Sequence, residues 1–298
     1  IKKAMDVSII IVNYNTKELT AACINSIFQY TEGVEFEVIL VDNASTDGSR
    51  EFFRKDTRII LIESEINLGF GRANNLGYEY SHGKYVFLLN SDTYLLNNAV
   101  KIFYDRMSVL PQTVACLGCM LSGPDGRYSH SYGDYLRWRN AWQSVLVSAF
   151  GRDDSVIRST DLPIEGTTVP VIIGADLFIR RKVIEQEGFF DPIFFMYHEE
   201  NDLQKRYGLA GYECRIVPGP EIVHLEGGSN PYKINILSTK GNFLFIKKWY
   251  SYPQYLSYRV VYALTHFPKI FIRQIPWEQR VLYLRILLFY RVRGSKNE

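Results

Sequence analysis

Cysteine is scarce in this sequence, and long apolar runs are missing from it. Four cysteines in 298 residues are too few to hold a chain of this size together by disulfides, so we expect reduced thiols of the cytosolic kind. No apolar stretch reaches the roughly 18 residues that a membrane-spanning helix needs. Ile1–Asp6 is polar and basic, and the apolar run Val7–Val12 after it is too short for the core of a signal peptide. The composition, 47% apolar and 22% charged, is that of an ordinary globular protein.

Acidic residues are almost missing from the last quarter of the chain. Residues 231–298 contain 12 Lys and Arg but only 2 Asp and Glu, a net charge of +10. The other 22 basic and 30 acidic residues give residues 1–230 a net charge of −8. An acidic body with a basic, aromatic-rich tail predicts cation-dependent chemistry in the first part and contact with an anionic surface in the second.

Strand and helix signals alternate over the first 110 residues. Amphipathic segments predict helices through Ile24, Ile27 and Phe28, over Arg72–Tyr80 and over Asn98–Met107. Apolar runs between them predict strands at Val7–Val12, Glu37–Val41, Ile59–Ile62 and Tyr85–Leu89. This order is typical of a parallel sheet with helices on both faces, so the expected fold class is α/β.

The pattern is looser beyond residue 110. Strands are expected at Val169–Ile173 and Phe178–Arg180, and helices at Val183–Glu187 and from His198 to Leu209. The aromatic stretch between Tyr132 and Pro163 predicts a loop or short helices. Cys116 and Cys119 have Cys-x-x-Cys spacing, but two further zinc ligands are not evident nearby, so buried thiols are the preferred interpretation.

Polar residues follow three of the predicted strands at their carboxyl ends. They are Asn13 and Asn15, Asp42 and Asp47, and Asn90 and Asp92. An open α/β sheet binds its ligand at this edge, and Asp92 offers a hard oxygen ligand for a divalent cation. Ordinary turns and helix caps are the alternative explanation, and Asp47 is expected to cap the helix that follows it.

These segments, in this order and spacing, resemble the inverting GT-A glycosyltransferases of family 2, in particular their rhamnosyltransferase-like branch. The resemblance covers roughly residues 7–230 and is carried by Ser8–Asn15, Val41–Ser49, Asn67–Phe70, Leu89–Asp92 and Phe194–Leu203. It implies a GT-A fold: a mixed central sheet flanked by helices, with a Rossmann-like nucleotide-binding half (1–110) and an acceptor half (111–230). A basic, aromatic helical extension (231–298) follows. It also implies transfer, with inversion, from a nucleotide-sugar donor with Mg²⁺ or Mn²⁺.

The resemblance implies roles for residues at the strand ends. Asp42 matches the aspartate that contacts the base imide, although an Asx turn is an alternative, and Tyr14 would stack on the base or simply pack. Asp92 is the expected metal ligand. Asn90 takes the first position of the usual Asp-x-Asp, which leaves the site one carboxylate short, and His224 is the candidate to compensate; a structural hydrogen bond is its alternative role. The full nucleotide-binding set implied is Asn13, Tyr14, Asn15, Asp42, Arg72, Asn90 and Ser91.

The acidic pair Glu199-Glu200 matches the motif that supplies the catalytic base. Glu200 stands where the family usually has Asp and is the preferred base, with Glu199 second; favourable charge at a helix N-terminus is the alternative. Inverting transfer needs a base near the acceptor hydroxyl, together with positioning and charge. The residues implied to line the donor sugar and the acceptor are Gly174, Ala175, Asp176 and Asp191, for which turn roles are the alternative.

The tail mixes apolar and aromatic residues with Lys and Arg in Phe243–Tyr250, Tyr255–Phe267 and Val281–Val292. Such segments suit peripheral contact with an anionic leaflet at the inner face of the plasma membrane. The alternative is packing on the catalytic part or on a second subunit, as in a homodimer. Nucleic-acid binding is not expected, because the body is acidic and no binding motif is present.

The expected donor is dTDP-rhamnose, with a UDP-hexose as the alternative. The expected acceptor is a growing envelope glycan or a polyprenyl diphosphate-linked sugar, in polysaccharide synthesis. A nucleotidyltransferase is less favoured, because Asn13-Tyr14-Asn15-Thr16 after the first strand is not a Gly-rich phosphate loop. An inactive sugar-binding protein would have no need of Asp42, Asp92 and the acidic pair together.

Overall fold

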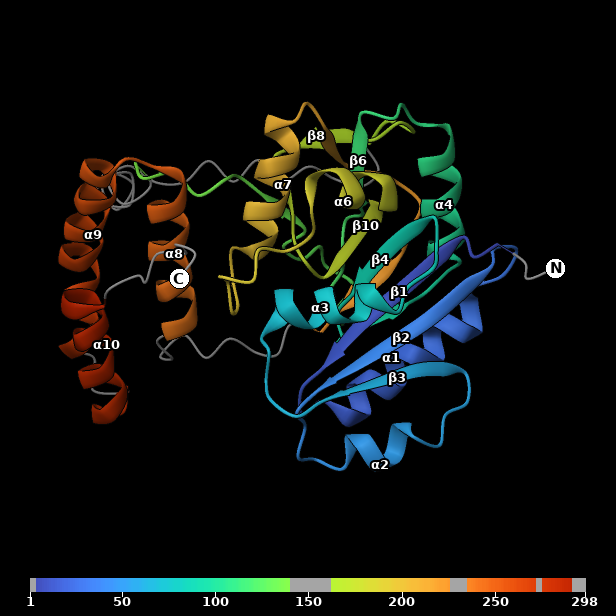
Figure 1. The fold of residues 1–298 in the computed structure, drawn as a ribbon, viewed down its shortest axis with the longest axis horizontal. Helices are drawn as coiled ribbons and strands as arrows, with labels where there is room; N and C mark the ends of the chain where they lie inside the picture. Colours follow the sequence, from blue (N-terminus) through green and yellow to red (C-terminus); the bar gives the residue numbers. More distant parts are fainter. Residues whose placement is uncertain (1–3, 140–161, 226–234, 272–274, 291–298) are drawn as a thin grey trace. The chain divides into compact units, whose positions relative to one another are not determined.

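The structure is a computed structural model that describes residues 4–139, 162–225, 235–271 and 275–290. The chain forms two compact units (Figure 1). The first, here called the catalytic unit, comprises Ile1–Asp134, Ile157–Pro192 and Glu199–Gly227. The second, the helical unit, comprises Tyr135–Val156, Ile193–His198 and Gly228–Glu298.

An eight-stranded sheet forms the centre of the catalytic unit, in the order β3-β2-β1-β4-β10-β6-β11-β8. The pairs β1–β2, β2–β3, β1–β4 and β6–β11 are parallel, whereas β10 is antiparallel to both β4 and β6. The sheet is therefore mixed, as a GT-A fold requires. The strands are β1 (Val7–Asn13), β2 (Phe36–Asn43), β3 (Ile59–Ser64), β4 (Tyr85–Leu89), β6 (Val114–Gly118), β8 (Thr167–Val169), β10 (Asp176–Arg180) and β11 (Glu213–Ile216).

Helices cover both faces of this sheet (Figure 1). The alternation of side chains along β1 shows why: Ile9 and Ile11 pack on one face with α1 and α4, and Ile10 packs on the other with α3, α6 and α7. A strand that is apolar on both faces needs both covered. The helices are α1 (Lys17–Tyr30), α2 (Ser49–Phe53), α3 (Phe70–Glu79), α4 (Ala99–Val109), α6 (Arg181–Glu187) and α7 (Glu199–Leu209).

Two small sheets flank the central one. β5 (Thr93–Leu95) pairs with β12 (Ile222–His224), and β7 (Tyr132–Gly133) pairs with β9 (Val171–Ile172). The prediction of one strand over Val169–Ile173 was wrong, because Pro170 has no N–H to continue a ladder. The chain instead leaves β8, which pairs with β11, and enters β9, which pairs with β7. Most of the loop expected between Tyr132 and Pro163 lies outside the described residues.

The helical unit consists of α8 (Ile236–Trp249), α9 (Tyr252–His266), a 3₁₀ helix η2 (Phe267–Phe271) and α10 (Trp277–Phe289). A capping box of Ser251 and Gln254 begins α9. The unit has a core of its own, in which Phe243 and Phe245 of α8 meet Tyr258 of α9 and Tyr283 of α10. Among the helices in the described part of the chain, none combines the length and the apolar character that crossing a bilayer demands.

Candidate active site

Residues predicted to form the site share one edge of the central sheet. The register pairs Asn13 with Asp42, at the carboxyl ends of β1 and β2. Asp176 is paired with Leu89, the last residue of β4. Because β10 runs antiparallel to β4, the first residue of β10 lies where β4 ends. The strand ends that carry Asn13, Asp42 and Asn90, and the start of β10, therefore line the same edge, where α/β sheets bind ligands.

Asn13 is the centre of a buried hydrogen-bond network. Its Nδ2 donates to Asp42 Oδ2 at 2.8 Å and to Ser45 Oγ at 3.0 Å. Its Oδ1 accepts from the hydroxyls of Thr16 and Thr20, each at 2.9 Å. A buried amide with its donors and acceptor all used holds its neighbours in one arrangement. Asn13 thus joins the ends of β1 and β2 to the start of α1.

Asp42 is enclosed by donors. Its Oδ1 accepts from the Ser45 N–H at 3.0 Å and from Arg50 Nε at 2.9 Å. The Asp42 side chain has no exposed surface, and Arg50 also donates to the Ser64 carbonyl. Sequence reasoning singled out neither Ser45 nor Arg50. The only available signal was that both follow Asp42 within eight residues, Ser45 in the turn after β2 and Arg50 in α2.

The turn after β1 meets the turn after β2 through Asn15. Asn15 Oδ1 accepts from the Thr46 N–H at 2.7 Å, and the Asn15 N–H donates to Ser45 Oγ at 3.0 Å. Tyr14, the residue before Asn15, is 48% exposed. Asp47 accepts from the Ser49 N–H at 3.1 Å, at the start of α2. The N-cap of α2 is Gly48, so Asp47 lies one residue before the capping position and contacts the start of the helix through this bond.

The turn after β4 is anchored by its main chain. The Asn90 N–H donates to the Ala175 carbonyl at 3.0 Å, and the Asn90 carbonyl accepts from Thr93 Oγ1 at 2.7 Å. Ser91 Oγ lies 3.1 Å from Thr16 Oγ1. The turn is therefore tied to β10 on one side and to the start of α1 on the other.

Asp92 and His224 lie side by side. β5 and β12 are antiparallel with Thr93 opposite His224, and the Leu225 N–H donates to the Asp92 carbonyl at 2.9 Å. This pairing places His224 Nε2 3.3 Å from Asp92 Oδ1, with 11% and 23% of the two side chains exposed. One carboxylate oxygen and one imidazole nitrogen that converge on a partly open point fit a divalent cation whose other ligands are phosphate and water. The described residues contain no cluster of three or more acidic, His or Cys side chains arranged around a metal position.

Asp176 is fully buried beside this turn. Its Oδ2 accepts from the Cys119 N–H at 2.7 Å, whereas Oδ1 has no hydrogen-bond partner among the described residues. Burial raises the pKa of Asp176 to about 7, against the lowering effects of the Cys119 hydrogen bonds and of His224. Gly174 lies against the Phe70 ring, 3.1 Å from where its Cβ would be, so the start of α3 closes over this segment. The side chain of Asp176 is thus inside the sheet rather than in the opening.

Glu199 and Glu200 begin α7. Glu199 is 3% exposed, and its Oε2 has no hydrogen-bond partner among the described residues, whereas Glu200 is half-buried. Burial, and then the charge of Glu200, raises the pKa of Glu199 well above its usual value. Burial also raises the pKa of Glu200. A Cβ added to Gly71 would lie 3.5 Å from Glu199 Cβ, so the start of α3 meets the start of α7.

Gln204 attaches α7 to the sheet. Its Oε1 accepts from the Ile172 N–H at 2.8 Å, and its Nε2 donates to the Ile172 carbonyl at 2.7 Å and to the Glu200 carbonyl at 3.2 Å. This fully buried side chain bonds to the main chain of Ile172 in the way that a neighbouring strand would. Sequence reasoning missed it, because a single Gln in a helix carries no signal of its partner.

Arg72 contacts the turn that contains Asp191 and Pro192. Arg72 Nε donates to the Pro192 carbonyl at 2.7 Å. Asn75 exchanges two hydrogen bonds with the main chain of Phe190, at 2.8 and 3.1 Å. The start of α3 therefore holds the turn that carries Asp191. This places the exposed Arg72 beside Pro192 and commits its Nε to the turn.

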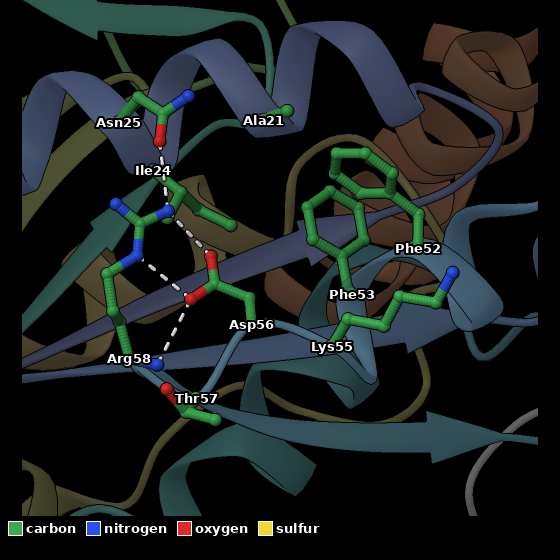
Figure 2. A pocket seen from close by; sticks show the side chains of 9 residues that line it. All are labelled: Ala21, Ile24, Asn25, Phe52, Phe53, Lys55, Asp56, Thr57 and Arg58. Atoms are coloured by element: carbon green, nitrogen blue, oxygen red, sulfur yellow. Dashed lines mark hydrogen bonds and ion pairs between the residues drawn. The ribbon is translucent and has the colours of Figure 1, made fainter.

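An open hollow of about 520 Å³ lies apart from this edge, between α1 and the segment after α2 (Figure 2). Two of its charged groups pair with each other: Arg58 donates to Asp56 Oδ2 at 2.7 Å, and it also donates to Asn25 Oδ1 at 2.9 Å. Arg58 comes just before β3, at the opposite edge of the sheet from the strand ends described above. No predicted site residue lines this hollow.

The sequence is similar to those of known glycosyltransferases. Residues 8–188 match the family described as "Glycosyl transferase family 2". The chain is 28% identical over 227 residues, 70% of its length and 74% of the other, to an N-acetylglucosaminyl-diphospho-decaprenol L-rhamnosyltransferase of Mycobacterium tuberculosis. It is 33% identical over 154 residues (47% and 59%) to the UDP-Glc:alpha-D-GlcNAc-diphosphoundecaprenol beta-1,3-glucosyltransferase WfaP of Escherichia coli. The crystal structure of GalNAc-T7 with UDP, GalNAc and Mn²⁺ superposes with a TM-score of 0.62 at 15% identity, covering 96% of this chain and 54% of that one.

The sequence match spans more than half of the chain, and its segment contains the strand ends that carry Asn13, Asp42 and Asp92. The mixed sheet and its helices have the architecture of solved glycosyltransferases. The expected fold class and enzyme class are therefore both confirmed. This chain belongs to glycosyl transferase family 2 and is a glycosyltransferase with a GT-A fold.

Proposed function

We propose that this glycosyltransferase transfers rhamnose, with inversion and with the help of a divalent cation, from dTDP-rhamnose to a sugar carried on a polyprenyl diphosphate. The observation that carries the proposal is the convergence of Asp92 and His224, 3.3 Å apart, at the sheet edge that also bears Asn13 and Asp42. A nucleotide pocket and a cation position at one edge suit a nucleotide-sugar donor.

Asp92 and His224 would hold the cation. When bound, Mg²⁺ or Mn²⁺ offsets the negative charge that builds on the departing diphosphate. Asn90 contributes through its main chain: its N–H and carbonyl fix the turn that aims Asp92. The missing carboxylate of the usual motif would be replaced by the imidazole of His224, a nitrogen ligand for first-row transition metals, while Asp92 supplies the oxygen ligand that Mn²⁺ and Mg²⁺ prefer.

The base of the nucleotide would lie against the turns after β1 and β2. Tyr14 is 48% exposed and can stack on a pyrimidine in its present position. Asp42 would accept the N3–H of thymine or uracil. Because its carboxylate has no exposed surface and pairs with Arg50, this contact requires the turn at Ser45 to move. Asn15, Ser91 and Arg72 complete the proposed donor site.

Glu200 is the proposed base, which takes the proton of the acceptor hydroxyl as that oxygen attacks the sugar. A base must be ionised and accessible, and Glu200 is half-buried whereas Glu199 is almost fully buried. Burial raises the pKa of both carboxyl groups, and Glu199, the more deeply buried of the two, is the less accessible to an acceptor. We assign Glu199 to positioning, and Gly174, Ala175 and Asp191 to the surroundings of the sugar. Asp176, predicted to line the same region, has its side chain buried inside the sheet and would support this segment from beneath.

The names of relatives support the donor and the acceptor. The mycobacterial relative is an L-rhamnosyltransferase that acts on N-acetylglucosaminyl-diphospho-decaprenol, and WfaP uses UDP-Glc with a GlcNAc-diphosphoundecaprenol. Both acceptors carry a sugar on a prenyl diphosphate. A UDP-hexose donor is therefore the second candidate, and work at a membrane surface follows from such an acceptor.

Binding of dTDP-rhamnose and UDP-glucose, each with Mn²⁺ or with EDTA, tests the proposal by calorimetry. We expect dTDP-rhamnose with Mn²⁺ to bind most tightly, and Asp92→Asn or His224→Ala to weaken binding by roughly tenfold or more, since each removes a direct ligand. Asp125→Asn and His82→Ala are matched controls, because both side chains lie on exposed turns away from the strand ends.

Three outcomes would count against it. If UDP-glucose binds more tightly than dTDP-rhamnose, the proposed donor is a UDP-hexose instead. If the donor binds equally well with Mn²⁺ and with EDTA, the proposed role of the cation is wrong. Unchanged Mn²⁺ affinity in His224→Ala would remove His224 from the cation site while leaving the nucleotide pocket in place.

A further inference from the structure

Helix α9 carries large apolar side chains on a face that nothing in the described part of the chain covers. We call this surface the α9 stripe: Tyr252, Leu256, Val260 and Leu264 of α9, continued by Phe267 and Phe271 of η2. Their exposed fractions run from 42% at Phe267 to 70% at Tyr252 and Leu264. Residues four apart are neighbours on a helix surface, so the α9 members form one continuous row about 18 Å long.

The opposite face of α9 is apolar too, but it is buried. Tyr255, Tyr258 and Val261 pack into the core of the helical unit. A helix that is apolar on both sides normally has both sides covered. Next to the stripe lies an open groove of about 640 Å³ whose lining is mainly Pro253, Leu256, Val260, Val261 and Leu264. The stripe therefore combines protruding side chains with a hollow wide enough for a lipid chain.

Charge indicates what covers this face. Between residues 235 and 290 the chain has eight Lys and Arg but a single acidic residue, Glu278. The one charged residue of α9, Arg259, is turned inward, where it donates to the carbonyls of Leu287 and Tyr290 at 2.9 and 2.6 Å. The stripe is thus an uncharged apolar row on a strongly cationic unit. Two copies of such a unit would repel each other, whereas an anionic leaflet attracts one.

We infer that the α9 stripe is the surface through which the helical unit lies on an anionic lipid bilayer. The inference deepens the proposed function and rests on it for the membrane-borne acceptor. Tyr252, Val260, Leu264 and Phe271 enter the boundary between headgroups and acyl chains, and a lipid chain occupies the groove. Basic side chains of the unit attract the anionic headgroups.

The structure shows that one of the tail segments predicted to lie on a bilayer is instead buried. The sequence pattern treated Phe243–Tyr250 as one of the segments able to lie on a bilayer. In the structure Phe243, Phe245 and Ile246 are buried in the core of the helical unit, so α8 has few apolar side chains to offer. The part of Val281–Val292 beyond residue 290 lies outside the described residues.

Flotation of the full chain with vesicles tests the inference. The vesicles are phosphatidylcholine with and without phosphatidylglycerol, and neither nucleotide nor sugar is added. Val260→Glu/Leu264→Glu is expected to weaken binding to the anionic vesicles at least tenfold, because two charges would have to enter the acyl boundary. Val260→Asn/Leu264→Gln removes the apolar contact without adding charge and is expected to weaken binding severalfold.

Val109→Glu/Leu209→Glu is the matched control. These side chains are 81% and 72% exposed on α4 and α7 of the catalytic unit, and the change in charge is identical. We expect this control to bind vesicles within about twofold of the wild type. Circular dichroism establishes that all variants keep their helices.

Equal loss in the control and in the stripe variants would overturn the inference, since charge alone would then explain the effect. Vesicle binding that is unchanged in the stripe variants would also overturn it. The inference would fail in the same way if light scattering showed that these variants only convert a dimer to a monomer while vesicle binding stays unchanged. Sugar transfer is measured separately. If the chain binds vesicles through the stripe but transfers no sugar to a prenyl diphosphate acceptor, the docking surface is supported and only the proposed function is wrong.

Discussion

Residues with positive φ border the proposed site. The four non-glycine examples among the described residues are Asn15, Ala44, Tyr197 and His198. The first two follow β1 and β2, and the other two immediately precede Glu199. Such conformations cost roughly 1–2 kcal/mol each for residues with a Cβ, and they persist where the surroundings impose them. Three of the sequence motifs thus coincide with backbone that is held in an unfavourable conformation.

The acidic pair gives the first residue-scale prediction. Glu200→Gln should lower kcat by about 10²-fold to 10⁴-fold, the usual contribution of a base. Glu199→Gln should stay within a few-fold of the wild type, because a protonated carboxyl resembles the amide that replaces it. Initial rates of sugar transfer, measured for both variants from about pH 5 to about pH 9, test these expectations.

The pH profile has a definite sign. The base acts when ionised, and burial raises the pKa of Glu200 above its usual value of 4.5. The acidic limb of kcat/KM should therefore lie above that value, and the rate should fall as the pH drops through it. Glu199→Gln should leave the limb in place. A reversed order, with Glu199→Gln inactive and Glu200→Gln active, would make Glu199 the base.

The sequence identified the positions of site residues better than their partners. Asp92 and His224 could be brought together from their order in a known motif set, and they do lie in contact. The enclosure of Asp42 by Arg50 and Ser45, and the burial of Asp176 against Cys119, could not be predicted. Those contacts depend on how a turn folds back on a strand, and the sequence pattern does not encode that geometry.

Helix α7 is the element that carries the proposed catalytic base. Its first residues are Glu199 and Glu200, and one turn later Gln204 binds both main-chain groups of Ile172 in β9. Arg206 fixes the next turn: it pairs with Asp202 and donates to the carbonyls of Glu187 and Phe189. The acidic pair is thus held to the sheet through hydrogen bonds made farther along the same helix.

We predict that Gln204→Leu lowers both stability and kcat. Loss of the amide leaves the buried N–H and carbonyl of Ile172 without their partner, at a cost of about 1–3 kcal/mol. Urea unfolding measures the stability, and kcat should fall while KM for the donor stays within about twofold, because the donor site lies at other elements.

Gln186→Leu is the control for this change. Gln186 lies on the exposed side of α6 and accepts one hydrogen bond from Tyr212. It should alter stability by no more than about 0.5 kcal/mol. A Gln204→Leu enzyme with normal kcat would show that α7 is placed without this anchor.

Elements with strong local signals were predictable. The predicted strand Tyr85–Leu89 has the bounds of β4, and the helix predicted at Asn98–Met107 differs from α4 by one or two residues. Continuous apolar runs and periodic patterns decide such cases. The prediction of a single strand at Val169–Ile173 was wrong because one Pro divides this apolar run between two different sheets. The orientation of α8, apolar side inward, also had to come from the structure, since α8 and α9 have similar compositions.

The whole molecule has separate cores in its two units. The catalytic unit buries side chains on both faces of its sheet, for example Phe103 and Leu203. The helical unit buries its own set around Phe243 and Tyr258. The charge follows a similar division, −8 over residues 1–230 and +10 over residues 231–298. Nucleotide chemistry and contact with an anionic surface would then depend on different parts of the chain.

This organisation predicts two thermal transitions with different responses. Proteins of more than one unit need not unfold in one step, and a ligand raises the melting temperature of the unit that binds it. In differential scanning calorimetry, dTDP with Mn²⁺ should raise the transition of the catalytic unit alone. Phe243→Ala removes a fully buried ring from the helical core, so it should destabilise that unit by about 3–5 kcal/mol and lower its transition.

Phe103→Ala is the matched change in the catalytic unit, since Phe103 is also fully buried. It should lower the transition that dTDP raises and leave the other in place. The decisive measurement is nucleotide affinity in Phe243→Ala, at a temperature where both units are folded. An affinity equal to that of the wild type follows from a nucleotide site built within the catalytic unit. Loss of that affinity together with a single merged transition would mean that the units fold as one, and that the helical core supports the strand ends where Asn13 and Asp42 lie.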